Sequence, residues 1–154
     1  MQDIVKLSVN QSSVLKRKGC TSWTKVERLL PLLRQSRWEQ VVTFADYCEL
    51  DFATVKSIES GGAYSFTSLF KYMNTINCYL KVDGNRVYSL QDLGAYLSNY
   101  RKLKAGIRVF AQRCGISPGA VLNIEKGRGF SKSVFIKYLS HLGTVDFGID
   151  EVTF

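Results

Sequence analysis

The side chains best suited to chemistry in this chain are four cysteines and one histidine, and their spacing disfavours a catalytic or metal site. Cys20, Cys48, Cys78 and Cys114 lie about 30 residues apart, with no C-x-x-C pair of the kind that zinc and redox motifs use. His141 has no carboxylate or cysteine near it in sequence, so we expect an ordinary surface residue. The glycines of ESGGAYS and EKGRGFS close helices instead of opening them after a strand, unlike those of phosphate-binding loops. We therefore expect buried, reduced cysteines, no metal, no cofactor and no enzymatic activity.

The cationic side chains offer a different chemistry, the binding of a polyanion. The 154 residues include 21 Lys and Arg against 13 Asp and Glu, a net charge of +8. Residues 83–143 hold ten of the basic and three of the acidic residues, which gives this segment +7. Nucleic acid is the first candidate partner. No run approaches the roughly 20 apolar residues of a membrane helix, and Asp3 stands where a signal peptide needs apolar residues, so we expect a cytoplasmic protein without membrane contact.

The elements that must position these cations occur twice, at the offset that separates Phe44 from Phe110. FADYCELDFATVKSIESGGAYSFTSLFKY from Phe44 aligns with FAQRCGISPGAVLNIEKGRGFSKSVFIKY from Phe110, with ten identities in 29 positions. Average composition gives about one or two identities by chance. Pairs such as Leu50 and Ile116 keep apolar character where the helical period requires it. The sequence therefore predicts two copies of one small helical fold.

Within the second copy, the spacing predicts two short helices joined by a tight turn. The first helix covers residues 107–114 and ends at Gly115 as a left-handed cap. Ser117 caps the second helix, and Pro118 takes its first position. A small alanine where the two helices cross lets their backbones approach. The positions that we expect in the core of the two copies are Phe44, Ala45, Val55, Ile58, Phe110, Ala111, Val121 and Ile124.

This pattern resembles a known DNA-binding motif. FAQRCGISPGAVLNIEKG is similar to the helix-turn-helix of the lambda-repressor/Xre-like family of regulators, down to the I-E-x-G that ends the recognition helix. The flanking helices LGAYLSNYRKLK and SVFIKYLSHLG extend the resemblance to about 60 residues, with Leu93, Leu97, Tyr100 and Leu103 expected to face inward. The resemblance implies a mainly α fold of tandem helix-turn-helix units, each with about five helices.

By the same resemblance, the second copy supplies most DNA contacts, because the outer face of its recognition helix enters the major groove. The implied groove residues are Ser117, Gly119, Ala120 and Asn123, and the implied phosphate ligands are Arg108, Lys126, Arg128 and Lys132. In the first copy, Lys56 and Ser57 occupy the equivalent face. Only Asn123 can pair well with a base, namely adenine, so we expect selection to depend on DNA shape and thymine methyl groups.

The first copy departs from the family pattern and is degenerate. Glu49 replaces the turn glycine, and Pro31 is expected to kink or restart the leading helix. Asp51 is a candidate N-cap that also puts negative charge near the place of a phosphate. Phe52 suits a protein contact better than a base. We expect this copy to contribute little to DNA binding and to be available to a protein partner.

Short strands are predicted beside the two copies. Val5, Leu7 and Val9 alternate at the N-terminus, Asp83 and Gly84 mark a turn between CYLKV and RVYS, and TVDFGI follows the second copy. A small mixed sheet would join the copies. The predicted domains are an N-terminal strand and basic arm (1–22), the degenerate first unit (23–82), and the second unit with a C-terminal strand (83–154).

Together these features predict a sequence-selective double-stranded DNA-binding transcriptional regulator, specifically a repressor. Because the two recognition helices differ, one chain that used both would need an asymmetric site with unlike halves. The other arrangement is a homodimer that reads DNA through the second copy and pairs through the first copy or the strand-like tails. Glu49, Asp51, Phe52 and the near-neutral charge of the first copy favour the homodimer. The alternative is a protein-interaction module (an antitoxin, an inhibitor or a polymerase adaptor) whose helix-turn-helix folds do not contact DNA. Salt-sensitive binding to duplex DNA separates these hypotheses.

Overall fold

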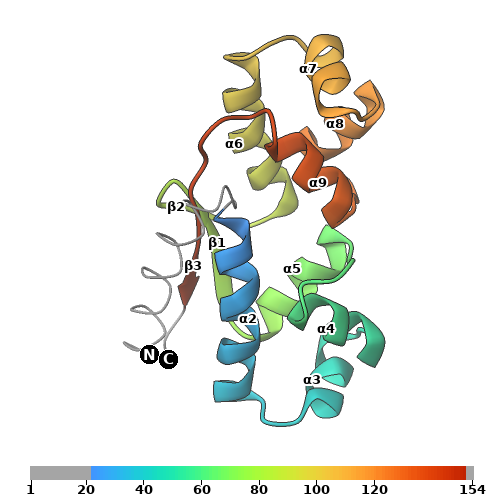
Figure 1. Ribbon diagram of the computed structural model, residues 1–154. Coiled ribbons are helices and arrows are strands. Elements are labelled where there is room, and N and C mark those ends of the chain that lie inside the picture. The colour runs from blue at the N-terminus through green and yellow to red at the C-terminus, as the bar shows by residue number, and fades with distance from the viewer. Residues whose placement is uncertain (1–21, 152–154) are drawn as a thin grey trace.

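The computed structural model describes residues 22–151, which are mainly helical (Figure 1). Eight helices account for 60% of this range, and three strands form one antiparallel sheet. In chain order the elements are α2 (Trp23–Arg37), α3 (Val41–Cys48), α4 (Phe52–Glu59), α5 (Phe66–Thr75), β1 (Cys78–Val82), β2 (Asn85–Val87), α6 (Leu90–Lys102), α7 (Ile107–Cys114), α8 (Pro118–Glu125), α9 (Lys132–Leu139) and β3 (Phe147–Glu151). The mainly helical class is confirmed. The strand expected around Val5, Leu7 and Val9, and Cys20, lie outside the described residues.

The helices recur at the spacing of the sequence repeat. We call α2–α5 the first unit and α6–α9 the second unit. Helices α3, α4 and α5 precede α7, α8 and α9 by the offset that separates Phe44 from Phe110, whereas α2 begins one residue earlier than that offset predicts. Each unit has four helices in the described range, one fewer than expected. All eight predicted core positions are buried, with no more than 3% of any side chain exposed.

The turn between the paired helices has the same conformation in both units. Gly115 has a φ of +72° and Glu49 a φ of +58°, so the glutamate adopts the left-handed conformation expected of the turn. Ser117 caps α8 as predicted, because its Oγ accepts a hydrogen bond from the Ala120 N–H at 3.1 Å. Asp51 stands at the N-cap of α4 but accepts no capping hydrogen bond. Its exposed carboxylate is left to the solvent.

The leading helices differ from expectation at two positions. Helix α2 runs without a restart through Pro31, and buried Leu30 and Leu33 on either side of the proline hold it against the core. Leu103 is 84% exposed instead of inward, because α6 ends at Lys102 and the chain leaves the helical stripe there.

The sheet links the ends of the two units. Its order is β2-β1-β3, and β1 follows the first unit whereas β3 follows the second. Asp83 (φ +49°) and Gly84 (φ +83°) form the predicted hairpin turn between β1 and β2, because positive φ at both central residues matches the twist of the strands. Strand β3 also runs antiparallel to β1, with Leu80 opposite Ile149. The described sheet is therefore antiparallel and not mixed, because β3 returns along β1 in the opposite direction.

Candidate nucleic-acid interface

A buried ion pair fixes the C-terminal end of α8. Arg101 on α6 contacts Glu125 through two nitrogen–oxygen distances of 2.9 and 2.7 Å, and the two side chains are only 6% and 7% exposed. Tyr138 on α9 donates its hydroxyl to the same carboxylate at 2.8 Å. Arg101 also donates to the Ala105 carbonyl at 3.2 Å, just before α7. These contacts join three helices and the entry to the fourth, so they position α8 relative to α7.

The electrostatics of this site follow from burial and pairing. Burial raises the pKa of Glu125, but the hydrogen bonds from Arg101 and Tyr138 outweigh it, and the net result is a lowered pKa. Burial and the hydrogen bond to Glu125 raise the pKa of Tyr138. The carboxylate is therefore charged and the phenol neutral at neutral pH.

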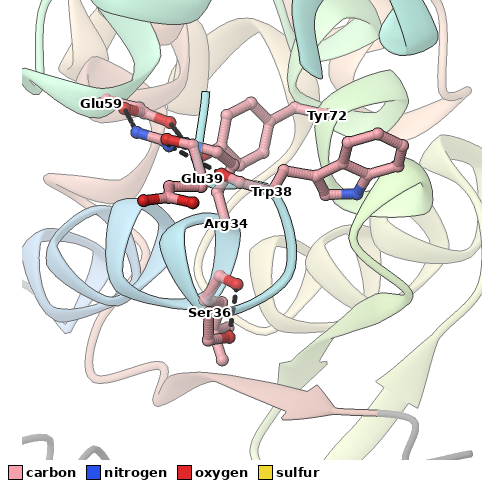
Figure 2. A network of polar contacts seen from close by, with 7 residues as sticks. Arg34, Ser36, Trp38, Glu39, Glu59 and Tyr72 are labelled. Carbon is pink, nitrogen blue, oxygen red and sulfur yellow. Dashed lines mark hydrogen bonds and ion pairs between the residues drawn. The ribbon is translucent and has the colours of Figure 1, made fainter. Parts of the chain in front are cut away.

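The first unit contains the same arrangement, which Figure 2 shows from close by. Arg34 contacts Glu59 with two distances of 2.8 Å, and Tyr72 donates to Glu59 at 2.7 Å. Arg34 also donates to the Trp38 carbonyl at 2.9 Å, before α3. The repeat alignment contains both glutamates and both tyrosines but missed the arginines. The sequence does contain this equivalence, because Arg34 aligns with Arg101 once the repeat alignment allows a single-residue insertion.

The fixed α7–α8 pair exposes most of the predicted contact residues of the second unit. Ser117 and Gly119 are exposed at the start of α8, and Ala120 and Asn123 are half-buried further along the helix. Three predicted phosphate ligands, Arg108, Lys126 and Arg128, are exposed. Among residues 22–151, none of these three forms an ion pair. Arg108 lies at the start of α7, and the other two cations follow the end of α8.

Lys132, by contrast, is engaged inside the molecule. Its Nζ lies 2.7 Å from a Glu27 carboxylate oxygen, donates to the Gly61 carbonyl at 2.6 Å and stands 5.5 Å from the centre of the Tyr64 ring. The side chain is 19% exposed. The expected phosphate ligand is thus a bridge between the two units, because α9 begins where the second unit meets the first.

The two candidate residues on α4 also differ from each other. Ser57 is half-buried and donates its hydroxyl to the Ala63 carbonyl, so its donor is used within the unit. Lys56 is exposed, with its Nζ 5.6 Å from the centre of the Phe52 ring. Of the two, Lys56 is the side chain available to a partner.

The two units carry opposite surface chemistry on the same backbone. On α3, exposed apolar side chains occupy the positions that are arginines on α7. Val42 is equivalent to Arg108, and Tyr47 is equivalent to Arg113. Exposed acidic side chains replace small ones at the turn: Glu49 stands for Gly115, and Asp51 for Ser117. Residues 41–60 contain one basic and four acidic residues, whereas residues 107–126 contain three basic and one acidic.

The cysteines and the histidine of the described residues lie where the sequence predicts them. Cys48, Cys78 and Cys114 are free and buried, and burial raises the pKa of Cys78 to about 12, so its thiol stays protonated. The described range holds no cluster of three or more metal-ligating side chains, and none of its helices is long and apolar enough to cross a membrane. His141 is exposed, as expected. Comparisons of the chain with protein-family models, curated proteins and solved structures find no match.

Proposed function

We propose that this protein is a sequence-selective double-stranded DNA-binding transcriptional regulator that acts as a repressor and reads DNA mainly through its second unit. The observation that carries the proposal is the α7–α8 surface, where a helix with an exposed to half-buried polar and small-residue face lies among three exposed cations that form no ion pair within residues 22–151. Its resemblance to the helix-turn-helix of lambda-repressor-like regulators supports the same assignment.

The proposed contacts divide by chemistry. Arg108, Lys126 and Arg128 bind phosphates and position the chain, because these contacts are independent of base sequence. Asn123 reads adenine through its amide, whose oxygen and nitrogen match the N6 and N7 edge in the major groove. Gly119 and Ala120 add no hydrogen bonds, and their small size lets α8 approach the floor of the groove.

Anisotropy of a labelled duplex, titrated at several salt concentrations, tests the proposal. If about six phosphates are contacted, the logarithm of affinity falls with the logarithm of salt at a slope of about −5. Arg108→Ala and Arg128→Ala should each weaken binding to all sequences alike and flatten the slope by about one. Asn123→Ala should instead reduce the preference among sequences.

Two control variants accompany these measurements. Arg28→Ala removes an exposed cation from α2, and Lys132→Met removes the cation held at the junction; neither should flatten the salt slope. Unchanged affinity in Arg108→Ala, Arg128→Ala and Asn123→Ala would contradict DNA reading through the second unit.

A second candidate function, a protein-interaction module, is favoured by the first unit. Val42, Tyr47 and Phe52 are 61%, 66% and 47% exposed, and solvated apolar side chains gathered on paired helices are typical of a protein contact. On this hypothesis the chain acts as an antitoxin, inhibitor or polymerase adaptor. Two results together would favour the protein-interaction hypothesis over the DNA-binding proposal. The chain would show no salt-dependent binding to duplex DNA, and the Tyr47→Lys substitution would abolish its binding to a protein partner.

A further inference from the structure

The two units meet at a junction that has two-fold symmetry. Ser65 pairs with Ser131, which is its own equivalent in the second unit. Two backbone hydrogen bonds of 2.9 Å flank this pair: Phe66 N to Phe130 O, and Lys132 N to Tyr64 O. Each bond becomes the other when every residue is replaced by its equivalent in the other unit. Reciprocal contacts between equivalent residues characterise an isologous interface, which in oligomers forms between two identical chains. Here one chain supplies both sides of such an interface.

Packing makes this junction rigid. The Phe66 ring lies 4.6 Å from the Phe130 ring and 4.4 Å from the Phe135 ring, measured between centroids. Trp23 stacks on Phe66 at 5.3 Å, and its indole N–H donates to the Tyr64 hydroxyl at 3.0 Å. All five aromatic side chains are buried. The relative orientation of the units is thus set by the core and not by a linker.

The junction places the equivalent helices on one side of the molecule. Figure 1 shows α4 and α8 on the same side, with α5 and α9 between them. The reciprocal contacts define a local two-fold axis between Ser65 and Ser131, and the two helix pairs occupy equivalent positions in the two units on either side of it. The arrangement that two chains supply in a symmetric dimer is therefore already present in one.

We propose that a single chain, and not a homodimer, spans two successive major grooves of one duplex, with α8 in one groove and α4 in the next. This inference rests on the proposed function. Two heads related by a two-fold axis fit half-sites about one helical turn, roughly 34 Å, apart. Because α4 presents Thr54 and Lys56 where α8 has Ala120 and Leu122, the two half-sites differ in sequence.

The surface charges make the first unit the weaker head. Glu49 and Asp51 are exposed at its turn, and Lys56 is the one cation of α4. Carboxylates placed against phosphates repel them, so the first unit lowers the affinity that its geometry would give. The repulsion offers a test of whether the first unit lies against DNA, because its removal should then strengthen DNA binding.

The test substitutes the second unit's own residues into the first, as the double variant Glu49→Gly and Asp51→Ser. Both changes suit the backbone: residue 49 has a φ of +58°, where glycine is favoured, and a serine at 51 can cap α4 as Ser117 caps α8. The variant and the unsubstituted chain are titrated with a duplex selected for binding, and with the same duplex cut to the half that the second unit occupies. Light scattering of the saturated complex gives the number of chains per duplex.

We expect one chain on the long duplex, and about tenfold tighter binding of the double variant to the long duplex only, since two charges leave the vicinity of phosphates. Two chains per duplex, or equal affinities of variant and unsubstituted chain on the long duplex, would overturn the inference and leave the proposed function intact. Equal tightening on both duplexes would overturn it too, because the effect would then be unrelated to the second groove. Absence of salt-dependent binding by the unsubstituted chain would remove the proposed function and this inference together.

Discussion

Glu125 is the residue on which the position of α8 depends most directly, since Arg101 and Tyr138 both donate to it. Glu125→Ala would leave the Arg101 guanidinium buried without its counterion. We expect the free energy of unfolding to fall by about 3–5 kcal/mol, measured by urea denaturation. Glu39→Ala, which removes an exposed carboxylate of the same type, should stay within about 0.5 kcal/mol of the unsubstituted protein. Similar losses in both variants would contradict the role assigned to the pair.

The lowered pKa of Glu125 also fixes the direction of a pH effect. A carboxyl whose pKa is lower in the folded state stabilises the fold above its unfolded pKa, and this contribution disappears as the pH falls through the folded pKa. The unsubstituted protein should therefore lose stability as the pH falls below about 4.3, the ordinary value for glutamate. Glu125→Gln should lose less over the same range. Parallel stability curves for the two proteins would show that Glu125 does not titrate in this way.

At the scale of single residues, the sequence predicted what local periodicity controls. The core positions, the left-handed cap at Gly115 and the Ser117 cap depend on neighbours a few residues away, and all of them are found as predicted. The resemblance implies a phosphate contact for Lys132, which lies just beyond α8. Its contacts with Glu27 and Gly61 come from the other unit, far away in the chain, which no local pattern reports.

At the scale of elements, Gly94 determines how closely α6 approaches α8. A Cβ at this position would lie 2.4 Å from the Glu125 carbonyl oxygen and 2.5 Å from that of Ile124. Alanine normally stabilises a helix relative to glycine by up to about 1 kcal/mol, but here the backbone of α8 would have to move. We expect Gly94→Ala to lower the free energy of unfolding by about 1–3 kcal/mol, measured by urea denaturation.

Gly119 provides the matched control on α8. A Cβ there would meet only the Ser117 Oγ, at 3.8 Å, so Gly119→Ala should be neutral or stabilising. A gain in stability in both variants would show that α6 and α8 are not packed as closely as described.

The bounds of the short paired helices were predictable because caps and turns specify them. The path of α2 through Pro31 was not, since burial of Leu30 and Leu33 on either side of the proline overrides the local preference for a break. The direction of β3 was not predictable either. Its pairing with β1 joins segments that are far apart in the chain, and alternation of apolar residues gives no strand direction.

At the scale of the whole molecule, the structure combines a symmetric scaffold with unlike surfaces. The sequence repeat predicted that two copies exist, but a repeat in sequence does not say how the copies are placed. That placement comes from the reciprocal contacts around Ser65 and Ser131. The composition of each segment predicted that the two units differ in charge. The structure places the differing residues on equivalent exposed turns.

Selection of binding sites from a random pool of duplex DNA by the full chain tests the DNA-binding account most directly. The account predicts that the pool is retained in a salt-dependent manner and converges on one motif, with its strongest positions in the major groove read by α8 and weaker ones about one helical turn away. The Asn123→Ala variant should select a less defined motif from the same pool. A pool that is not retained, or that is retained without converging on any motif, would contradict sequence-selective DNA binding.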